Sequence, residues 1–471
     1  MKILFVSHGF PPHATAGTET YTAELALALK SRGHEVAVFT AHKDISRTDL
    51  SVDDREWRGV AVHEIVNNLY HEDFRETWSH ARIERAFESV LGAFRPDVVH
   101  FQHLLYLSAG CVGAARARGA AVLFTLHDFW LECARFGQRV HHDGAVCHTI
   151  DFARCGTCLA HFKYGQGTIE RTVGGVIASV RSGTGLNLGP LARGAAAKLS
   201  KPGPNEAASD AVSGAQRERA ARFEALARER WTSLQAAVAP NVDLFLSPSR
   251  FLRQRLVDEW GLAPEHIEHL RFGVDPQAFA PKMRTQSERL RVAFIGSLVP
   301  LKGPHLLLEA WGLVDPALRS KGSLVVYGPS QHRPDYQEEL ASRARASGAR
   351  LGGKLDRAGV SATLAATDLL VVPSLWYENS PLVILEALAS RTPLLVSDLG
   401  GMAELVEPGV SGFHFRMGDA RDLADKLALA LAGRAGLETL YARAPDLPTF
   451  DAHVDAIEAR YRRFTERDRR P

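Results

Sequence analysis

Two acidic side chains, Glu378 and Glu386, stand with seven residues between them in a segment that suits phosphate and sugar chemistry. The apolar run 368–373 predicts a strand before them. Ser380 and Pro381 predict the start of a helix, because serine is a favoured N-cap and proline suits the first helical position. The free N–H groups and positive dipole end of such a helix bind anions, and a carboxylate can accept hydrogen bonds from ribose hydroxyls. The pattern predicts a site for a nucleotide-diphosphate sugar, with phosphates at the helix end, ribose at Glu386 and sugar near Glu378.

A second motif, Phe294–Gly303, follows the same plan of a strand that leads into a helix. Lys302 lies near its end, where an ammonium group can reach a diphosphate as a point charge. Asn379 and Leu382 flank the predicted helix start and are expected to line the same donor site. The alternative is that Lys302 and the two glutamates are solvent-exposed surface charges.

Histidines follow two other apolar runs that predict strands. His127 comes after the run Ala121–Thr125, and His100 and His103 lie at the end of a run that begins at Asp97. Side chains at the carboxyl ends of parallel strands face the ligand crevice of a doubly wound sheet. We therefore expect His127 to be catalytic, and His100 and His103 are candidates for the acceptor side. Loop histidines without a function are the alternative.

Short apolar runs alternate with helical segments in both halves of the chain. The clearest runs are Lys2–Ser7, Glu35–Thr40, Asp97–Phe101, Ala121–Thr125, Arg291–Gly296, Ser323–Tyr327, Leu369–Val372 and Pro393–Ser397. Such runs are typical of parallel strands covered by helices on both faces. Two series of them predict an α/β protein with two Rossmann-like, doubly wound domains that face each other across a cleft.

Three segments follow from this pattern. We expect an acceptor-side domain at residues 1–240, with an insertion at about 133–235, and a nucleotide-sugar-binding domain at 241–445. Residues 446–471 predict an amphipathic helix, because their apolar side chains recur at steps of four and three. These side chains are Phe450, Val454, Ile457, Tyr461 and Phe464.

The motifs resemble the retaining glycosyltransferases of family GT4, which have the GT-B fold. The family signature is two glutamates separated by seven residues and preceded by a Pro-Ser strand end, here Pro373 and Ser374. The resemblance covers nearly the whole chain apart from about residues 160–235. It implies transfer of a sugar from a UDP-, GDP- or ADP-sugar to a saccharide or lipid-linked hydroxyl, as in cell-surface polysaccharide or glycolipid assembly. It implies retention of configuration and no cofactor for catalysis. The family's last helix crosses back to the first domain, as residues 446–471 could.

The resemblance also implies roles for single residues. Gly17 corresponds to a Gly-rich loop that approaches a ligand closely. His127 would lie beside the donor sugar, and Gly353 and Lys354 belong to the stretch that contacts the nucleobase. Ser297 stands where the family usually has arginine, so one of two expected diphosphate cations is missing. The leaving phosphate of similar enzymes helps to deprotonate the acceptor, so no dedicated base is implied.

Composition sets limits on the class of protein. The chain has 471 residues, of which 45% are hydrophobic and 23% charged, as in a soluble globular enzyme of two or three domains. A net charge of +2 gives no reason to expect nucleic acid as a partner. The first apolar run is too short for a signal peptide, and no run approaches the ~20 residues of a membrane span. We therefore expect a cytoplasmic protein.

Four of the five cysteines fall within 26 residues. They are Cys133, Cys147, Cys155 and Cys158. In a reduced compartment such a set predicts thiols or metal ligands instead of disulfides, and four thiolates can hold a structural zinc. An iron–sulfur cluster, substitution of nearby histidines as ligands, and four plain thiols are the alternatives.

Residues 165–216 are rich in Gly, Ala, Ser and Pro, which predicts a long loop that is either functional or disordered. Between His161 and Gln235, eleven Lys or Arg residues stand against six Asp or Glu residues. This basic excess suits contact with anionic lipid at the inner membrane face. A solvated insertion is the alternative.

Two other classes of function are open on the sequence. One is a GT-B nucleotide-sugar epimerase that hydrolyses its donor, which the spacing of Glu378 and Glu386 disfavours. The other is a non-catalytic scaffold in polysaccharide assembly, with a donor site weakened by Ser297.

Overall fold

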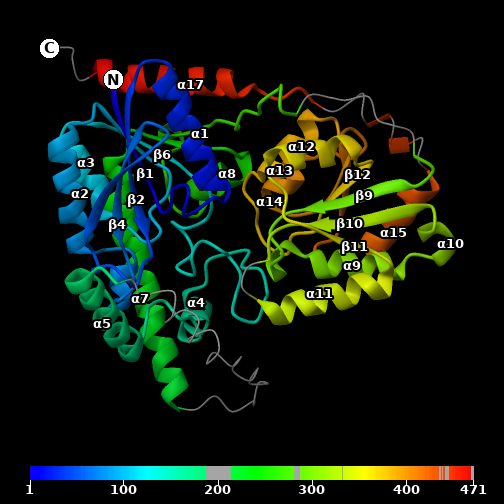
Figure 1. The fold of residues 1–471 in the computed structure, drawn as a ribbon, viewed down its shortest axis with the longest axis horizontal. Coiled ribbons are helices and arrows are strands. Elements are labelled where there is room, and N and C mark those ends of the chain that lie inside the picture. The colour runs from blue at the N-terminus through cyan, green and yellow to red at the C-terminus, as the bar shows by residue number, and fades with distance from the viewer. Residues whose placement is uncertain are drawn as a thin grey trace. The chain divides into compact units, whose positions relative to one another are not determined.

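The computed structural model describes residues 1–186, 214–279, 287–330, 333–433, 436–437, 439–440 and 445–467. The chain forms two compact units, each built around one sheet (Figure 1). Unit 1 contains Met1–Leu246, Leu256–Glu268 and Ile457–Pro471, and unit 2 contains Ser247–Arg255 and His269–Ala456.

The sheet of unit 1 has the strand order β3-β4-β2-β1-β5-β6-β7-β8. Its strands are β1 (Lys2–Ser7), β2 (Glu35–His42), β3 (Val52–Trp57), β4 (Val60–Val66), β5 (Val98–Phe101), β6 (Ala121–Thr125), β7 (Leu244–Ser247) and β8 (Ile267–His269). Strand β3 is antiparallel to β4, whereas β1 is parallel to both β2 and β5. The side chains of 3–6 in β1 are fully buried, as expected for a strand covered on both faces. The chain moves from β1 to β2 on one side and later to β5 on the other, so the topological switch point lies between β1 and β5.

The described helices of unit 1 cover this sheet and fill the insertion. They are α1 (Gly17–Ser31), α2 (Ala81–Phe94), α3 (Gly110–Ala117), α4 (Phe152–Ala160), α5 (Thr168–Thr184) and α7 (Gly214–Val238), with η1 at Phe74–Thr77, η2 at Ala239–Asn241 and η3 at Pro264–His266. Helix α8 (Arg250–Asp258) begins in unit 2 and ends in unit 1.

The sheet of unit 2 has the order β11-β10-β9-β12-β13-β14, with parallel neighbours throughout. Its strands are β9 (Leu290–Ile295), β10 (Gly322–Tyr327), β11 (Arg350–Gly353), β12 (Leu369–Val372), β13 (Leu394–Ser397) and β14 (Gly412–Phe415). Its described helices are α9 (Pro304–Leu313), α10 (Pro316–Arg319), α11 (Pro334–Ser347), α12 (Arg357–Ala366), α13 (Leu382–Ala389), α14 (Gly400–Leu405) and α15 (Ala420–Ala432), with η4 at Pro300–Lys302. The switch point of this sheet lies between β9 and β12.

Helix α17 (Phe450–Arg467) is the predicted amphipathic C-terminal helix. From Ile457 onward it belongs to unit 1, where Tyr461 is fully buried and its hydroxyl lies 2.6 Å from Nδ1 of His100. Glu458 forms ion pairs with Arg32 and His34. The last helix is therefore bound to unit 1 by a buried hydrogen bond and by charge.

The insertion differs from the predicted long loop, because residues 168–184 form α5. The side chain of Glu170 accepts a hydrogen bond from the backbone N–H of Gly167 and so caps the helix start. Gly174 lets the helix approach Tyr70, since a Cβ at this position would lie 1.9 Å from the tyrosine oxygen. Residues 187–213, which contain most of the Gly- and Pro-rich segments, lie outside the described part of the chain.

Candidate functional site

Lys302 and Glu378 meet at the switch point of unit 2. Lys302 ends η4 after β9, and Glu378 lies in the connection that follows β12. The Nζ atom of Lys302 is 2.5 Å from Oε1 of Glu378. The same oxygen accepts hydrogen bonds from Ser374 Oγ at 2.8 Å and from Trp376 Nε1 at 2.9 Å. Oε2 of Glu378 has no hydrogen-bond partner among the described residues, so one carboxylate oxygen is left to accept a ligand hydroxyl.

Gly303 allows these two connections to approach each other. Its φ is +69°, and a Cβ here would lie 2.0 Å from the carbonyl oxygen of Pro373. A backbone hydrogen bond of 2.8 Å from Leu375 N–H to the carbonyl of Leu301 joins the two connections. A side chain at Gly303 would therefore move Lys302 away from Glu378.

Charge compensation keeps Glu378 ionised. Burial alone would raise the pKa of this carboxyl, but the charge of Lys302 and the hydrogen bonds from Lys302, Trp376 and Ser374 outweigh burial and hold the pKa below its usual value. Glu378 is only 9% exposed.

The start of α13 differs by one residue from the prediction. Pro381 is the N-cap, with an extended backbone (ψ 121°), and the helix begins at Leu382. Pro381 supplies the carbonyl that accepts the N–H of Ile384, so the first helical hydrogen bond starts there. Ser380 makes no capping hydrogen bond, and its buried Oγ has no partner among the described residues. The N-terminus of α13 thus has backbone N–H groups and one hydroxyl available to an anion.

Asn379 is held in place behind this helix start. Its Oδ1 accepts a hydrogen bond from Ser249 Oγ. Gly401 N–H donates to the carbonyl of Glu378 at 3.0 Å, and a Cβ on Gly401 would lie 1.6 Å from the carbonyl oxygen of Asn379. The backbone of Glu378 and Asn379 is therefore held in place by its contacts with Gly401 of α14.

Glu386 lies within α13 and forms no side-chain hydrogen bond with the described residues. Burial raises the pKa of its carboxyl to about 7, although the charge of Arg357 acts in the opposite direction. A carboxylate with this environment gains from any ligand that brings hydroxyl donors to it.

The other predicted donor residues lie at carboxyl ends of strands of the same sheet. Ser297 lies two residues after the end of β9, and its hydroxyl makes no hydrogen bond with the described residues. Gly353 ends the edge strand β11 with φ +77° and is followed by Lys354. Whether these residues touch a nucleotide stays a prediction.

A cluster of histidine and acidic side chains lies at the switch point of unit 1. His8, after β1, has Nε2 at 3.1 Å from Oε1 of Glu19, and His103, after β5, has Nε2 at 2.9 Å from Oδ2 of Asp128. The two imidazole rings are 4.4 Å apart. Nδ1 of His103 accepts the N–H of Leu105, so Nε2 must carry the proton that is donated to Asp128.

The predicted catalytic residue His127 belongs to this cluster of side chains. Its Nε2 lies 2.9 Å from Oε1 of Gln102, and Tyr21 packs edge-on against it. Burial, followed by the charge of His103, holds its pKa well below the usual value, so His127 is neutral at pH 7. A neutral imidazole can donate or accept a hydrogen bond but offers no positive charge.

His100 and Gly17 occupy different surroundings. His100 is fully buried, and both ring nitrogens have partners, at 2.6 Å from the Tyr461 hydroxyl and 2.8 Å from the Thr125 hydroxyl. Direct contact between His100 and an acceptor would require these bonds to break. Gly17 is the exposed first residue of α1, whose N-cap Ala16 makes no side-chain capping bond.

The four clustered cysteines line one cavity of about 40 Å³. Burial, followed by the neighbouring Cys133, Cys147 and Cys158, raises the pKa of the Cys155 thiol to about 12. No three of these sulfur atoms come within 4.8 Å of one another, although all four residues are described. Ligand sulfurs around a tetrahedral zinc are about 3.8 Å apart. The cavity brings the cysteines together without forming a ready zinc site, so the structure gives no support to zinc.

Sequence reasoning missed several of these residues. His8 follows a strand just as His127 does, so the same rule would have found it. Ser374 and Trp376 lie within the glutamate motif, but no spacing rule indicates that their donors point at Glu378. The contacts of Glu19 with His8 and of Asp128 with His103 depend on the order of β1, β5 and β6 in the sheet, which the sequence does not reveal.

Comparison with known proteins defines the class. Residues 16–150 match the family described as glycosyl transferase 4-like domain, and residues 277–445 match glycosyl transferases group 1. The sucrose-phosphate synthase structure from Thermosynechococcus elongatus has a TM-score of 0.64 at 18% identity and covers 98% of both chains. The structure of HepE from Anabaena with UDP and glucose has a TM-score of 0.60 at 14% identity and covers 98% of this chain and 99% of that chain. The two parallel α/β units therefore have the GT-B fold, as predicted.

Sequence relatives add the family. A D-inositol 3-phosphate glycosyltransferase from Kribbella flavida is 31% identical over 201 residues, which is 39% of this chain and 47% of that protein. One from Geodermatophilus obscurus is 33% identical over 224 residues, or 44% of this chain and 50% of that protein. The chain spans about half the length of the curated relatives it matches. The chain belongs to the GT4 glycosyltransferase family, which confirms the resemblance.

Proposed function

We propose that the protein is a retaining glycosyltransferase that moves a sugar from a nucleotide-diphosphate sugar to a hydroxyl acceptor. The observation that carries this proposal is the contact of Lys302 with Glu378 at the switch point of unit 2. The cation, the carboxylate and the start of α13 all follow the two central strands of this sheet, β9 and β12. The structures of HepE with UDP and glucose support a UDP-sugar, and GDP- and ADP-sugars remain to be compared.

Each residue of the proposed site would have a separate role in the transfer reaction. Lys302 and the N–H groups of α13 would stabilise the charge that develops on the departing diphosphate. Oε2 of Glu378 would accept a hydroxyl of the transferred sugar, and Glu386 would accept the ribose hydroxyls. In unit 1, His127 is neutral and suits a hydrogen bond to an uncharged hydroxyl. The missing arginine at Ser297 leaves Lys302 as the cation of its motif.

Product stereochemistry tests the reaction. The donor base is first identified by thermal shift with UDP-, GDP- and ADP-sugars, since a ligand at 100 times its Kd adds about 2.7 kcal/mol of stability. Proton NMR of the first-formed product should then show the anomeric configuration of the donor. An inverted anomer contradicts a retaining mechanism, and free sugar without transfer favours a donor-hydrolysing enzyme.

We further propose that the acceptor is lipid-linked and that unit 1 docks on an anionic membrane surface through α5. Three apolar side chains on one face of this helix, Ile169, Val173 and Val176, are 80%, 48% and 59% exposed. Leu186, just after the helix, is 63% exposed. Together they make up half of the exposed large hydrophobic side chains of the described residues. Contiguous exposed apolar surface of this kind marks interaction sites.

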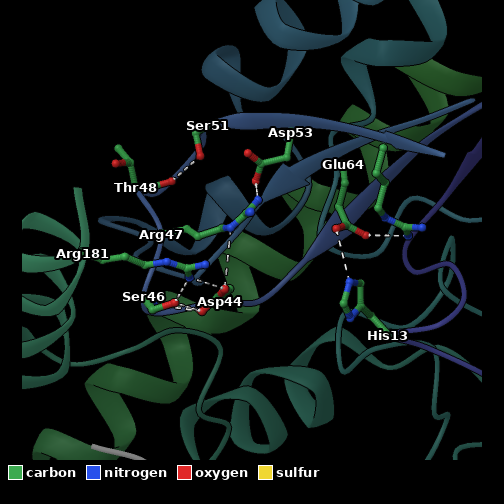
Figure 2. Close-up of polar contacts among 10 residues, drawn as sticks. His13, Asp44, Ser46, Arg47, Thr48, Ser51, Asp53, Glu64 and Arg181 are labelled. Atoms are coloured by element: carbon green, nitrogen blue, oxygen red, sulfur yellow. Dashed lines mark hydrogen bonds and ion pairs between the residues drawn. The ribbon is translucent and has the colours of Figure 1, made fainter. Parts of the chain in front are cut away.

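Basic groups and position both favour a lipid surface. The exposed Arg219 and Lys163, whose side chain is 66% exposed and paired with Glu170 at 2.8 Å, line a cavity at the start of α5. Figure 2 shows Arg181 of α5 reaching Asp44 and Ser46 after β2. The apolar face is therefore carried at the carboxyl edge of the unit 1 sheet. Among the described residues, no helix combines the length and apolar character needed to span a bilayer.

A structural zinc held by the four clustered cysteines stays a proposal of the sequence. The four cysteines share one cavity, but their sulfur atoms do not have the geometry of a zinc site. Zinc content of a Cys155→Ser/Cys158→Ser variant tests it.

A further inference from the structure

The connection between β4 and α2 brings together two imidazoles and a carboxylate. His71 follows β4, Glu76 lies in η1 and His80 is the N-cap of α2. One ligand atom from each residue lies within 4.8 Å of the other two, and Nδ1 of His71 is 3.8 Å from Oε2 of Glu76. Within the described parts of the chain, this is the one group of three or more His, Cys, Asp or Glu residues with such an arrangement.

The imidazoles of this group form no hydrogen bonds within the described part of the protein. The side chain of His71 is 4% exposed, and neither its ring nor that of His80 hydrogen-bonds to any described residue. Their ring nitrogens are therefore available as ligand atoms, and imidazole is a common zinc ligand. Both imidazoles point toward the same carboxylate, which supplies a ligand of opposite charge.

We propose that His71, Glu76 and His80 bind a zinc ion, with three protein ligands and one open position. Two imidazoles and one carboxylate are a known zinc donor set, and imidazole suits zinc better than magnesium or calcium. Tetrahedral zinc ligands of this type lie about 3.4 Å apart, and the present atoms lie within 4.8 Å of one another, so they need to approach by about 1.4 Å at most. Glu76, whose side chain is 29% exposed, has room to make that movement.

The surrounding backbone already holds the ligands. Glu76 Oε2 accepts the N–H of Glu72 at 2.6 Å, and the N–H of His80 donates to Ser108 Oγ at 2.9 Å. Two of the three ligands are therefore positioned before any metal arrives.

The site would stabilise the platform on which α5 rests. Arg171 of α5 donates to the carbonyl of His71, and the N–H of Gln166 donates to the carbonyl of Leu69 at 2.9 Å. A metal at His71 would fix the same connection from its other side. This role is independent of the proposed transfer reaction, which uses residues of unit 2 for the donor.

Zinc binding by the full-length chain tests the site. Protein purified without a histidine tag is stripped with a chelator and titrated with zinc by calorimetry and equilibrium dialysis. The His80→Ala and Glu76→Gln variants should each bind zinc at least about tenfold more weakly, since even second-sphere changes cost 10–100-fold. His266→Ala removes an exposed histidine of unit 1 and should leave zinc affinity unchanged.

The cysteine cluster requires its own control. The Cys155→Ser/Cys158→Ser variant should keep the zinc that His80→Ala loses. Cobalt(II) in the site should give ligand-field bands without the intense sulfur charge-transfer absorption of thiolate ligands. The proposal is overturned if the wild-type chain takes up no zinc, if His80→Ala and Glu76→Gln bind like wild type, or if only the cysteine variant loses zinc. Circular dichroism of each variant separates loss of ligand from loss of fold.

Discussion

The Nζ atom of Lys302 lies 2.5 Å from Oε1 of Glu378, although the two residues are 76 positions apart in the chain. Each is the charged end of a separate strand-to-helix connection, and the close approach at Gly303 joins the two connections. In the proposed reaction, the pair would hold a cation for phosphate and a carboxylate for sugar in one place before any donor binds. Such preorganised charge stabilises a developing leaving group without reorganisation.

The first prediction concerns donor affinity. Lys302→Ala and Glu386→Ala should each weaken binding of the nucleotide sugar by roughly 1.5–3 kcal/mol, because each removes a charged hydrogen-bond partner. Calorimetry measures the change, and Lys321→Ala, which removes an exposed lysine of unit 2, is the matched control. Unchanged affinity in both site variants would place the donor elsewhere.

The second prediction follows from the lowered pKa of Glu378. An acid whose pKa is lower in the folded state than in the unfolded state stabilises the fold above its usual pKa of about 4.3, and this stability is lost as pH falls through the folded value. Lys302→Met should therefore reduce the free energy of unfolding by roughly 1.5–3 kcal/mol at pH 7. The difference from wild type should shrink as pH falls below about 4.3.

Urea unfolding at a series of pH values measures this difference. A gap between wild type and Lys302→Met that stays constant from pH 7 to acid would mean that lost packing, and not lost charge, causes the change. Glu378→Gln in both backgrounds completes a double-mutant cycle for the pair.

The third prediction uses the raised pKa of Glu386. With a pKa of about 7, its carboxylate fraction rises about tenfold between pH 6 and pH 8, so donor affinity should rise by about the same factor. A nucleotide sugar is the right probe, because its diphosphate is esterified at both ends and has no proton that titrates near pH 7. Glu386→Gln should bind weakly and lose this pH dependence.

The same group has an opposite effect on stability. Its folded pKa exceeds its unfolded value, so the folded state binds more protons and wild type loses stability as pH rises from about 4.3 through 7. Glu386→Gln should therefore become more stable relative to wild type over that range. A flat difference would contradict a raised pKa at this position.

The strands could be predicted from the sequence, whereas the polar partners of the site residues could not. Strands β1, β6 and β12 begin and end at the residues that their apolar runs predicted, because parallel strands buried on both faces leave a continuous apolar signature. Strand β3 was missed, because at the edge of the sheet its residues 52–57 are mostly charged and half exposed.

Local signals also misplaced two features. Ser380 and Pro381 have the composition of a cap and a first helical residue, but the close packing of Gly401 beneath Asn379 sets the backbone there, and the helix begins one residue later. Glycine-rich composition hid α5, whose Gly174 serves packing against Tyr70. The partners Trp376, Glu19 and Asp128 depend on side-chain direction and strand order, which no local spacing reveals.

The last prediction concerns the apolar face of α5. Burial of an Ile or Val side chain contributes about 1.5–3 kcal/mol, so Ile169→Glu/Val176→Glu should weaken binding to vesicles of anionic lipid at least about tenfold. Leu429→Glu changes a residue of α15 that is 68% exposed, and it should bind vesicles like wild type.

Flotation with phosphatidylglycerol and with phosphatidylcholine vesicles, at low and high salt, separates charge from apolar contact, because surface charges are screened by salt. Donor affinity should be equal in all three proteins, so that a membrane defect is distinguished from a misplaced donor site. Two results would show that α5 contacts protein instead of lipid. In the first, the wild-type protein does not bind anionic vesicles. In the second, the oligomeric state of the double variant changes while its vesicle binding does not.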